Sequence, residues 1–343
     1  EVLAAANRRA KSPLRPDELA LLVRPRCAPW TVSDVPILDE CEELLGPMPS
    51  SSAPSQEMDP AELERARAAI EGQNLGGGIV TAQMLAEHSA AQESWAPLSE
   101  RAAKDRTWAY GHIVVDEAQE LSPMAWRALL RRCPSRSFTV VGDLDQRRGS
   151  TRPPSWEKAL GPAARAFAAE YALTVSYRTP ATLTSLAEGV VARAGAPVLD
   201  PMTAVRDVED CYRVTHVDAP EEAPASSRRD SPLWRAVVDA QREAEQRLDR
   251  EAGASRGRIA IIVGAQRARA WGADVDGETA LSERVALLSA NASKGLEFDS
   301  VILVEPGEIM SDGTGDLFVA LTRATHDVHV VHAGPLPAGM EEW

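Results

Sequence analysis

The sequence predicts an α/β protein with parallel β-sheets, and two observations lead to this class. From residue 112 onward, short runs of apolar and β-branched residues alternate with longer stretches of helical periodicity. The runs "HIVVD" (112–116) and "FTVVGD" (138–143) flank the helical stretch "SPMAWRALLRRC" (122–133). A strand, a helix and a strand at this spacing are typical of a βαβ unit, whose strands are parallel.

The first 111 residues are dominated by helical patterns. A helix is expected around "VSDVPILDECEELLG" and should end at Gly46. A Pro- and Ser-rich linker or surface loop follows at 47–60. Two further helices are expected in "AELERARAAIEG" (61–72) and "LGGGIVTAQMLAEHS" (75–89).

The second half continues the alternation of strands and helices. In the first βαβ unit, Ser122 should cap the helix and Pro123 should occupy its first position. Further strands are predicted at 173–178, 211–217, 258–263, 284–290, 300–306 and 327–333. Further helices are predicted at about 180–193, 232–250 and 316–324, and a surface loop at 218–232. This is enough material for a second α/β domain, as the length of 343 residues also suggests.

Composition excludes several classes of protein. No run approaches 18 consecutive apolar residues, so we expect no membrane span. The four cysteines form no C-x-x-C pair, which argues against zinc or a disulfide framework and favours the cytoplasm. The formal net charge is −14, so any contact with DNA or RNA would need a local groove or a partner.

Two adjacent carboxylates, Asp116 and Glu117, directly follow the apolar run of the first predicted strand. Neighbouring carboxylates repel each other, and a divalent cation commonly offsets that repulsion. Ligands of open parallel sheets bind beyond the carboxyl ends of the strands, where "GDLDQ" (142–146) should also lie. The pattern suits a nucleotide site, in which one carboxylate holds Mg²⁺, the other activates water and a glutamine reaches the γ-phosphate.

Five stretches in order resemble the motifs of superfamily-one helicases of the UvrD/Rep type. They are "VVDEAQEL", "VVGDLDQ", "LTVSYRTP", "LLSANASKGLEFDSVILV" and "LFVALTRAT", which are similar to motifs II to VI. Within that group, "WTVSDVPILDE", "ELSPMAWRALLRRCPSRSFTVVGD" and "KGLEFDSVILVEP" look most like HelD-type (HelR) proteins, which associate with RNA polymerase. The resemblance implies the P-loop NTPase (RecA-like) fold, with part of a first RecA-like domain at 1–170 and a second at 171–343.

The resemblance also implies roles for individual residues around ATP. Asp116 would hold Mg²⁺, Glu117 would be the catalytic base and Gln146 would sense the γ-phosphate. Arg178 and Arg323 would be arginine fingers from the second domain, because a guanidinium fork matches the charge of a transferring phosphoryl group.

Three further residues would contact the nucleotide itself. Tyr177 would stack on the adenine or sugar, and Gly295 and Glu297 of "KGLEFD" would bind the cofactor, with Glu297 accepting a hydrogen bond from the ribose. An ion pair between Glu297 and Lys294 is the alternative for that carboxylate.

The sequence departs from the family pattern at two points. It contains no G-x-x-x-x-G-K-[ST] stretch, the loop that would cradle the β- and γ-phosphates. We expect that loop to lie upstream in a longer protein, so that residues 1–343 alone would hydrolyse ATP poorly. Asn291 stands where UvrD-type enzymes have a histidine, in a motif that contacts single-stranded DNA.

Three functions therefore remain in competition. The first is a HelD-like ATPase motor that remodels RNA polymerase core or releases it from nucleic acid, with a DNA or RNA single strand as a further partner. The second is a UvrD-like 3'-5' DNA helicase. The third is a non-catalytic binding module that kept the fold. The ordered motifs argue against the third, and the acidic charge and Asn291 weigh against the second.

Overall fold

The computed structural model describes residues 2–9, 14–25, 27–46, 97–105, 108–148, 152–218, 231–274 and 282–341. The helices predicted at 61–72 and 75–89 and the loop predicted at 47–60 lie outside the described residues, as does most of the loop at 218–232. The chain divides into two compact units, one of residues 1–109 with 127–132 and one of residues 110–126 with 133–343. The two predicted RecA-like domains, 1–170 and 171–343, stay a prediction.

The smaller unit is helical in its described part. Its elements are α1 (Val2–Arg9), α2 (Pro16–Leu21), η1 (Val32–Asp34), α3 (Val35–Leu45) and α6 (Leu98–Lys104), together with the end of α7 (Pro123–Arg132). The helix predicted before Gly46 is α3, and Gly46 follows it with a φ of 73°, a backbone conformation that glycine adopts without strain. Arg127 and Arg131 near the end of α7 bind Glu40 of α3, so opposite charges join the two helices.

The first βαβ unit forms as the sequence predicts. Strand β1 (Ile113–Val115) pairs in parallel with β2 (Phe138–Val140), with Ile113 opposite Phe138. Helix α7 connects them and begins at Pro123, after Ser122. The Ser122 hydroxyl accepts a hydrogen bond from the Ala125 N–H at 3.1 Å, which satisfies a donor that the first helical turn leaves unpaired.

A five-stranded parallel sheet forms the centre of the larger unit, in the order β5-β9-β8-β6-β7. Its strands are β5 (Tyr212–His216), β6 (Ile259–Val263), β7 (Val285–Ser289), β8 (Phe298–Val304) and β9 (Ala324–His332). The helices of this region are α9 (Ala181–Arg193), α10 (Pro232–Ala252), α11 (Ala265–Trp271), α12 (Pro306–Asp312) and α13 (Thr314–Leu321), with the short turn η7 (Asn291–Ser293). The predicted α/β class with parallel sheets is confirmed.

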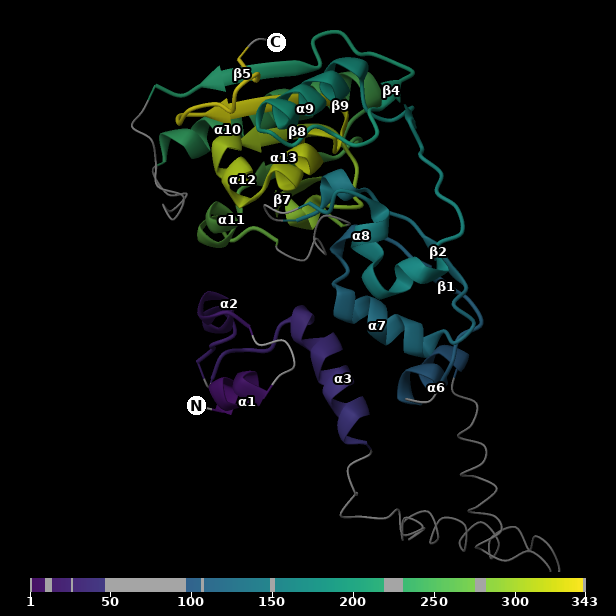
Figure 1. The fold of residues 1–343 in the computed structure, drawn as a ribbon. Helices are drawn as coiled ribbons and strands as arrows, with labels where there is room; N and C mark the ends of the chain where they lie inside the picture. The colour runs from purple at the N-terminus through teal and green to yellow at the C-terminus, as the bar shows by residue number, and fades with distance from the viewer. Residues whose placement is uncertain are drawn as a thin grey trace, which may run out of the picture. The chain divides into compact units, whose positions relative to one another are not determined.

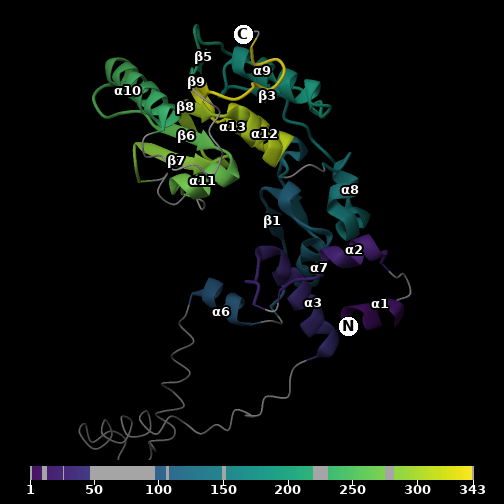
Figure 2. The same ribbon diagram turned by 90° about the vertical axis from the view of Figure 1, so that its left-hand side faces the viewer.

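Successive side chains along each strand point to opposite faces of this sheet and form two hydrophobic cores, one on each face. Ile259, Ile261 and Val263 of β6 pack with α10 and α11, whereas Ala260 and Ile262 pack with α9, α12 and α13. Figures 1 and 2 show the two groups of helices on opposite sides of the strands. The strands are therefore buried on both faces, as their continuous apolar sequences require.

Shorter elements lie within the first βαβ unit and between it and this sheet. They are η3 (Ala118–Glu120), η4 (Leu144–Gln146), α8 (Trp156–Leu160), η5 (Gly161–Ala166), β3 (Val175–Ser176) and β4 (Thr203–Ala204). Strand β3 pairs in parallel with β4 over two residues each. The strand predicted at 173–178 is thus shorter than expected, because its partner strand offers a ladder of only two residues.

The helix predicted at 316–324 also ends early, at Leu321. The carbonyl of Arg323 accepts the N–H of Phe298 at 3.1 Å, so the chain has already joined the ladder with β8 there. Arg323 consequently lies between the end of α13 and the start of β9.

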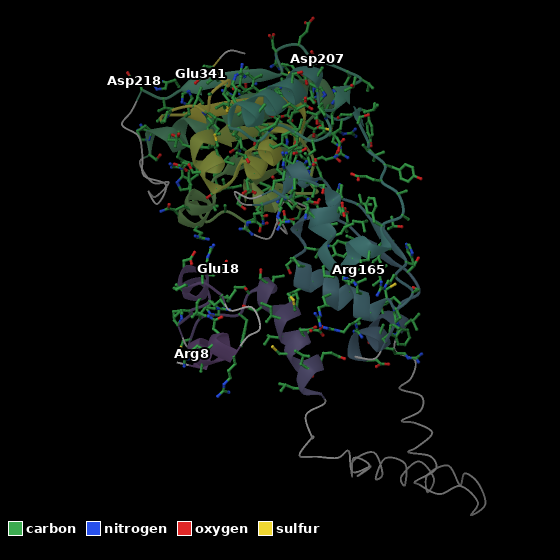
Figure 3. The ribbon with its side chains drawn as sticks, viewed as in Figure 1. Arg8, Glu18, Arg165, Asp207, Asp218 and Glu341 are labelled. Atoms are coloured by element: carbon green, nitrogen blue, oxygen red, sulfur yellow. The ribbon has the colours of Figure 1, made fainter. Side chains whose placement is uncertain are left out.

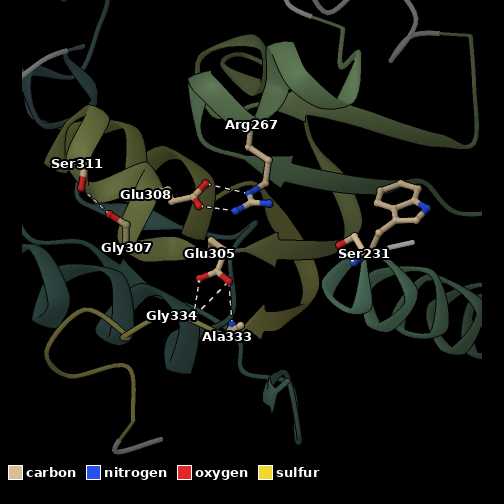
Figure 4. Close-up of polar contacts among 9 residues, drawn as sticks. Ser231, Arg267, Glu305, Gly307, Glu308, Ser311, Ala333 and Gly334 are labelled. Atoms are coloured by element: carbon tan, nitrogen blue, oxygen red, sulfur yellow. Dashed lines mark hydrogen bonds and ion pairs between the residues drawn. The ribbon is translucent and has the colours of Figure 1, made fainter. Parts of the chain in front are cut away.

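Polar contacts of the chain itself occupy the carboxyl edge of the five-stranded sheet (Figure 4). The Glu305 carboxylate, just after β8, accepts the N–H groups of Ala333 and Gly334, which follow β9. Nearby, the fully buried guanidinium of Arg267 donates two hydrogen bonds to Glu308, at 3.0 and 2.5 Å. These contacts lie at the edge at which a ligand of an open parallel sheet would usually bind.

Charged side chains cover the outside of the larger unit. Asp207, Asp218 and Glu341 are exposed there (Figure 3). No helix within the described part of the chain combines the length and the apolar character needed to cross a membrane.

We predict that Asp327 is a major polar anchor of this sheet. Its carboxylate lies on β9, is 4% exposed, and binds Arg213 of β5 at 3.2 Å and Arg247 of α10. Asp327→Asn should lower the free energy of unfolding by about 2–4 kcal/mol, since two arginines lose their counter-charge. Urea unfolding would measure the loss.

The matched control is Asp239→Asn, which removes an exposed pair with Arg242 at 3.1 Å. That change should cost less than about 0.5 kcal/mol. Equal losses for both variants would contradict the assignment.

Candidate functional site

The two adjacent carboxylates follow the carboxyl end of β1, where the chain turns sharply. Glu117 has a φ of 49°, a left-handed conformation that is uncommon outside glycine. The Asp116 Oδ1 accepts the N–H of Glu117 at 2.8 Å, which fixes the exposed Asp116 carboxylate at the tip of the turn. Retained strain of this kind is often found at functional sites.

Gln119 is a residue of this site that the sequence analysis missed. It is 1% exposed, its Nε2 donates to Glu117 Oε2 at 2.6 Å, and its Oε1 accepts the N–H of Asp143 at 3.1 Å. One amide therefore holds the Glu117 carboxylate and the end of β2 together. The sequence feature that could have indicated Gln119 is its position in "DEAQ", two residues after Glu117.

Gly142 makes this contact possible. A Cβ built on Gly142 would lie 2.4 Å from Gln119 Oε1, 2.9 Å from the Trp156 ring and 3.0 Å from the Ala118 nitrogen. Any other residue would push the Gln119 amide away from its partners and would also displace the Trp156 ring.

Gln146 lies on η4, immediately after β2. Its Nε2 donates to Asp143 Oδ2 at 2.9 Å, and its Oε1 is 3.4 Å from Nη2 of Arg323. Residues 177 positions apart in sequence therefore meet in one unit.

Arg323 is the most deeply buried charged residue among the eight predicted site residues, with 7% of its surface exposed. Burial lowers its pKa from the usual arginine value, and the positive charge of Arg178 acts in the same direction. The carboxylates of Glu117, Glu297 and Asp143 oppose this shift. At least one charged residue from each of the other four motif-like stretches therefore acts on the Arg323 guanidinium: Glu117, Asp143, Arg178 and Glu297.

Glu297 and Lys294 do not form the ion pair that was the alternative expectation for "KGLEFD". Glu297 instead binds Arg178 at 2.5 Å, and Lys294 binds Glu120 of η3 at 2.5 Å. Each side chain meets an opposite charge from a distant part of the sequence, which spacing along the chain does not reveal. Glu120 and Lys294 are a second pair that the sequence analysis missed.

The remaining two predicted site residues are Tyr177, with an exposed ring, and Gly295, with an unusual backbone conformation. Tyr177 is 73% exposed, so its ring face is accessible to a ligand. Gly295 has a φ of 69°, and an added Cβ would meet nothing within 4 Å. Glycine at this position therefore allows the left-handed backbone of the turn before β8, and the space beside it is open.

The eight predicted residues occupy defined ends of the strands. Asp116 and Gln146 lie beyond the carboxyl ends of β1 and β2, as expected, whereas Glu297 and Arg323 lie before the amino ends of β8 and β9. Glu297 and Arg323 are therefore at the opposite edge of the five-stranded sheet from Glu305 and Arg267.

Within the described ranges, no group of three or more His, Cys, Asp or Glu side chains could hold a metal ion. Mg²⁺ usually takes one or two carboxylates and completes its shell with water and phosphate oxygens. The exposed, fixed Asp116 carboxylate fits that donor set.

Comparison with known proteins gives likenesses in structure alone. No protein-family model matches the chain, and no curated protein matches it. The chain is similar to the arterivirus helicase, nonstructural protein 10, with 17% identity and a TM-score of 0.36 over 68% of this chain and 41% of that one. A structure of the arterivirus helicase with DNA gives 19% identity and a TM-score of 0.35 over 65% and 40%.

A third likeness is to the C-terminal domain of a possible DNA helicase from Lactobacillus plantarum WCFS1. It has 21% identity and a TM-score of 0.30 over 48% of this chain and 92% of that domain. The chain spans about two fifths of the length of the arterivirus proteins.

We predict that the contact between Gly142 and Gln119 contributes measurably to stability. Gly142→Ala should lower the free energy of unfolding by about 1–3 kcal/mol, because the added methyl group displaces an amide that is then buried without its partners. Gly111→Ala is the control, since its Cβ would meet nothing within 4 Å, and it should change stability by less than about 0.5 kcal/mol. Urea unfolding in which both glycine variants match the parent would rule the contact out as a stabilising one.

Proposed function

We propose that the chain carries the catalytic base, the phosphate-sensing glutamine and the arginine fingers of an ATP-hydrolysing motor. The motor is of the superfamily-one helicase type and is most like the HelD proteins. The observation that carries the proposal is the meeting of Gln146 with Arg323, on which the charges of Glu117, Arg178 and Glu297 act. Residues of these types in one cluster suit phosphoryl transfer, where positioning and charge stabilisation do most of the work.

Each side chain has a definite task in this proposal. Glu117, held by Gln119, would accept a proton from the water whose oxygen attacks the γ-phosphorus, while the bond to the β–γ bridging oxygen breaks. Arg178 and Arg323 would offset the negative charge that develops on the phosphoryl oxygens, and Gln146 would contact the γ-phosphate. Tyr177 would stack on the nucleotide, and Glu297 and Gly295 would line its ribose side.

Mg²⁺ would be held by Asp116, and it would neutralise charge on the phosphates. The ion pair between Arg178 and Glu297, with 41% and 44% of the two side chains exposed, would keep Arg178 near the site before ATP arrives. Exposed pairs of this kind are worth about 0–1 kcal/mol, so a phosphate group could readily displace Glu297.

The proposed partner is RNA polymerase core, in the cytoplasm. Support comes from the HelD-like stretches and from the net charge of −14, which disfavours contact with nucleic acid phosphates. An acidic protein complements the basic nucleic-acid channel of a polymerase.

The base assignment predicts a separation of binding from chemistry. In the full-length protein, Glu117→Gln should leave the Kd for ATP within a few-fold of the parent and lower kcat by about 10²–10⁴-fold, because only proton transfer is lost. The amide still accepts a hydrogen bond from Gln119, so the local geometry is kept. A coupled phosphate-release assay and nucleotide titration give the two values.

Glu157→Gln, on the exposed surface of α8, is the charge-matched control and should leave kcat unchanged. Turnover of the Glu117 variant within a few-fold of the parent would remove Glu117 from the role of base.

The partner assignment predicts which macromolecule binds and which one stimulates turnover. At physiological salt, the full-length protein should bind RNA polymerase core more tightly than single-stranded DNA, and its ATPase should respond more to the polymerase. Titration of each partner with parallel turnover measurements tests both statements. Tight DNA binding with DNA-stimulated turnover and no capture of polymerase would favour the UvrD-like helicase instead.

A further inference from the structure

The loop that carries Tyr177 and Arg178 has little support from the sheet. It follows β3, which is two residues long, and the ladder bonds around it are Thr203 N–H to the Thr174 carbonyl at 2.7 Å and Val205 N–H to the Ser176 carbonyl at 2.8 Å. The chain leaves the ladder at Tyr177. A charge that must be placed accurately therefore stands on backbone that the strand does not hold.

Arg206, just after β4, supplies the missing support. Its Nε donates to the Tyr177 carbonyl at 3.1 Å, and its Nη2 donates to the Arg178 carbonyl at 2.5 Å and to the carbonyl of Thr325. The Arg206 carbonyl accepts the N–H of Ala181 at 2.9 Å, so the same residue also holds the start of α9. Arg206 thus contacts the loop at Tyr177 and Arg178 and again at Ala181, on either side of the buried Thr179 and Pro180.

The third acceptor connects the two proposed arginine fingers. Thr325 lies on β9, two residues after Arg323. One planar guanidinium therefore joins the backbone of Arg178 to the strand that Arg323 precedes. The rigid fork suits this task, since three acceptors in fixed directions need several donors in one plane, which an ammonium group does not offer.

We propose that Arg206 is a positioning residue, which sets the place of Arg178 relative to Arg323 for phosphoryl transfer. This inference rests on the proposed function. Arg206 itself acts on backbone carbonyls and needs no contact with the nucleotide. A misplacement of about 1 Å at a catalytic group can cost on the order of 10²-fold in rate.

A double-mutant cycle in the full-length protein tests the proposal. Arg206→Ala should lower kcat by about 10–100-fold with a KM within a few-fold of the parent. The variant with both Arg178→Ala and Arg206→Ala should be no slower than Arg178→Ala alone, because Arg206 acts through Arg178. Multiplicative losses in the double variant, or an unchanged kcat for Arg206→Ala, would overturn the proposal.

Two further variants separate positioning from general damage. Arg206→Lys keeps the charge and the stem but not the fork, so it should recover only part of the lost kcat, and it replaces the alanine variant in the cycle if that protein does not fold. Arg242→Ala removes an exposed arginine of α10 and should leave kcat unchanged.

Hydrogen exchange gives a readout that does not depend on turnover. Amides of residues 174–182 should exchange faster in Arg206→Ala than in the parent or in Arg242→Ala, since the loop loses its anchor. Unchanged exchange would overturn the anchoring role. A parent protein without ATPase activity but with faster loop exchange in the variant would instead count against the proposed function.

Discussion

Burial of both faces of the five-stranded parallel sheet is the interaction on which the larger unit depends. Apolar side chains of β6 and β8 alternate between a core under α9, α12 and α13 and a core under α10 and α11. Both faces are covered, so a charge within a strand, such as Asp327, is buried and needs ion-pair partners. Further charged groups lie at the two edges where strands begin and end. One edge carries Glu305 and its partners, and the other carries Glu297 and Arg323. The two hydrophobic cores thereby limit where charged side chains can lie.

Hydrogen bonds from two polar side chains hold the turns of the candidate site in place. Gln119 holds both Glu117 and the N–H of Asp143, and Arg206 holds the carbonyls of Tyr177 and Arg178. In both cases a buried or partly buried polar side chain fixes a turn that follows a very short strand. Strands of two or three residues set the direction of the chain but hold it with few ladder bonds. The side-chain hydrogen bonds therefore hold the backbone of the turns that follow.

The sequence was sufficient for the strands of the five-stranded sheet and for the longer described helices, but not for the short helices α8, α11 and α12 or for the contacts between distant motifs. The strands around Ile261 and Ile302 were predictable because buried parallel strands have continuous apolar sequences. The pairing of Arg178 with Glu297, and of Lys294 with Glu120, was not, because it depends on tertiary geometry that no local pattern encodes. The same reason hid Arg206, whose partners are carbonyl groups and therefore leave no mark in the sequence.

The position of β9 in the sheet has a consequence for how the chain is made. β9 is the last of the five strands in sequence, yet it lies between β5 and β8. Until residues 324–332 have left the ribosome and joined the sheet, β8 has an open, apolar edge and β5 has no neighbour in this sheet. An unpaired edge of this kind invites pairing with other chains. Nascent chains are therefore open to such pairing between the emergence of β8 from the ribosome and the addition of β9 to the sheet.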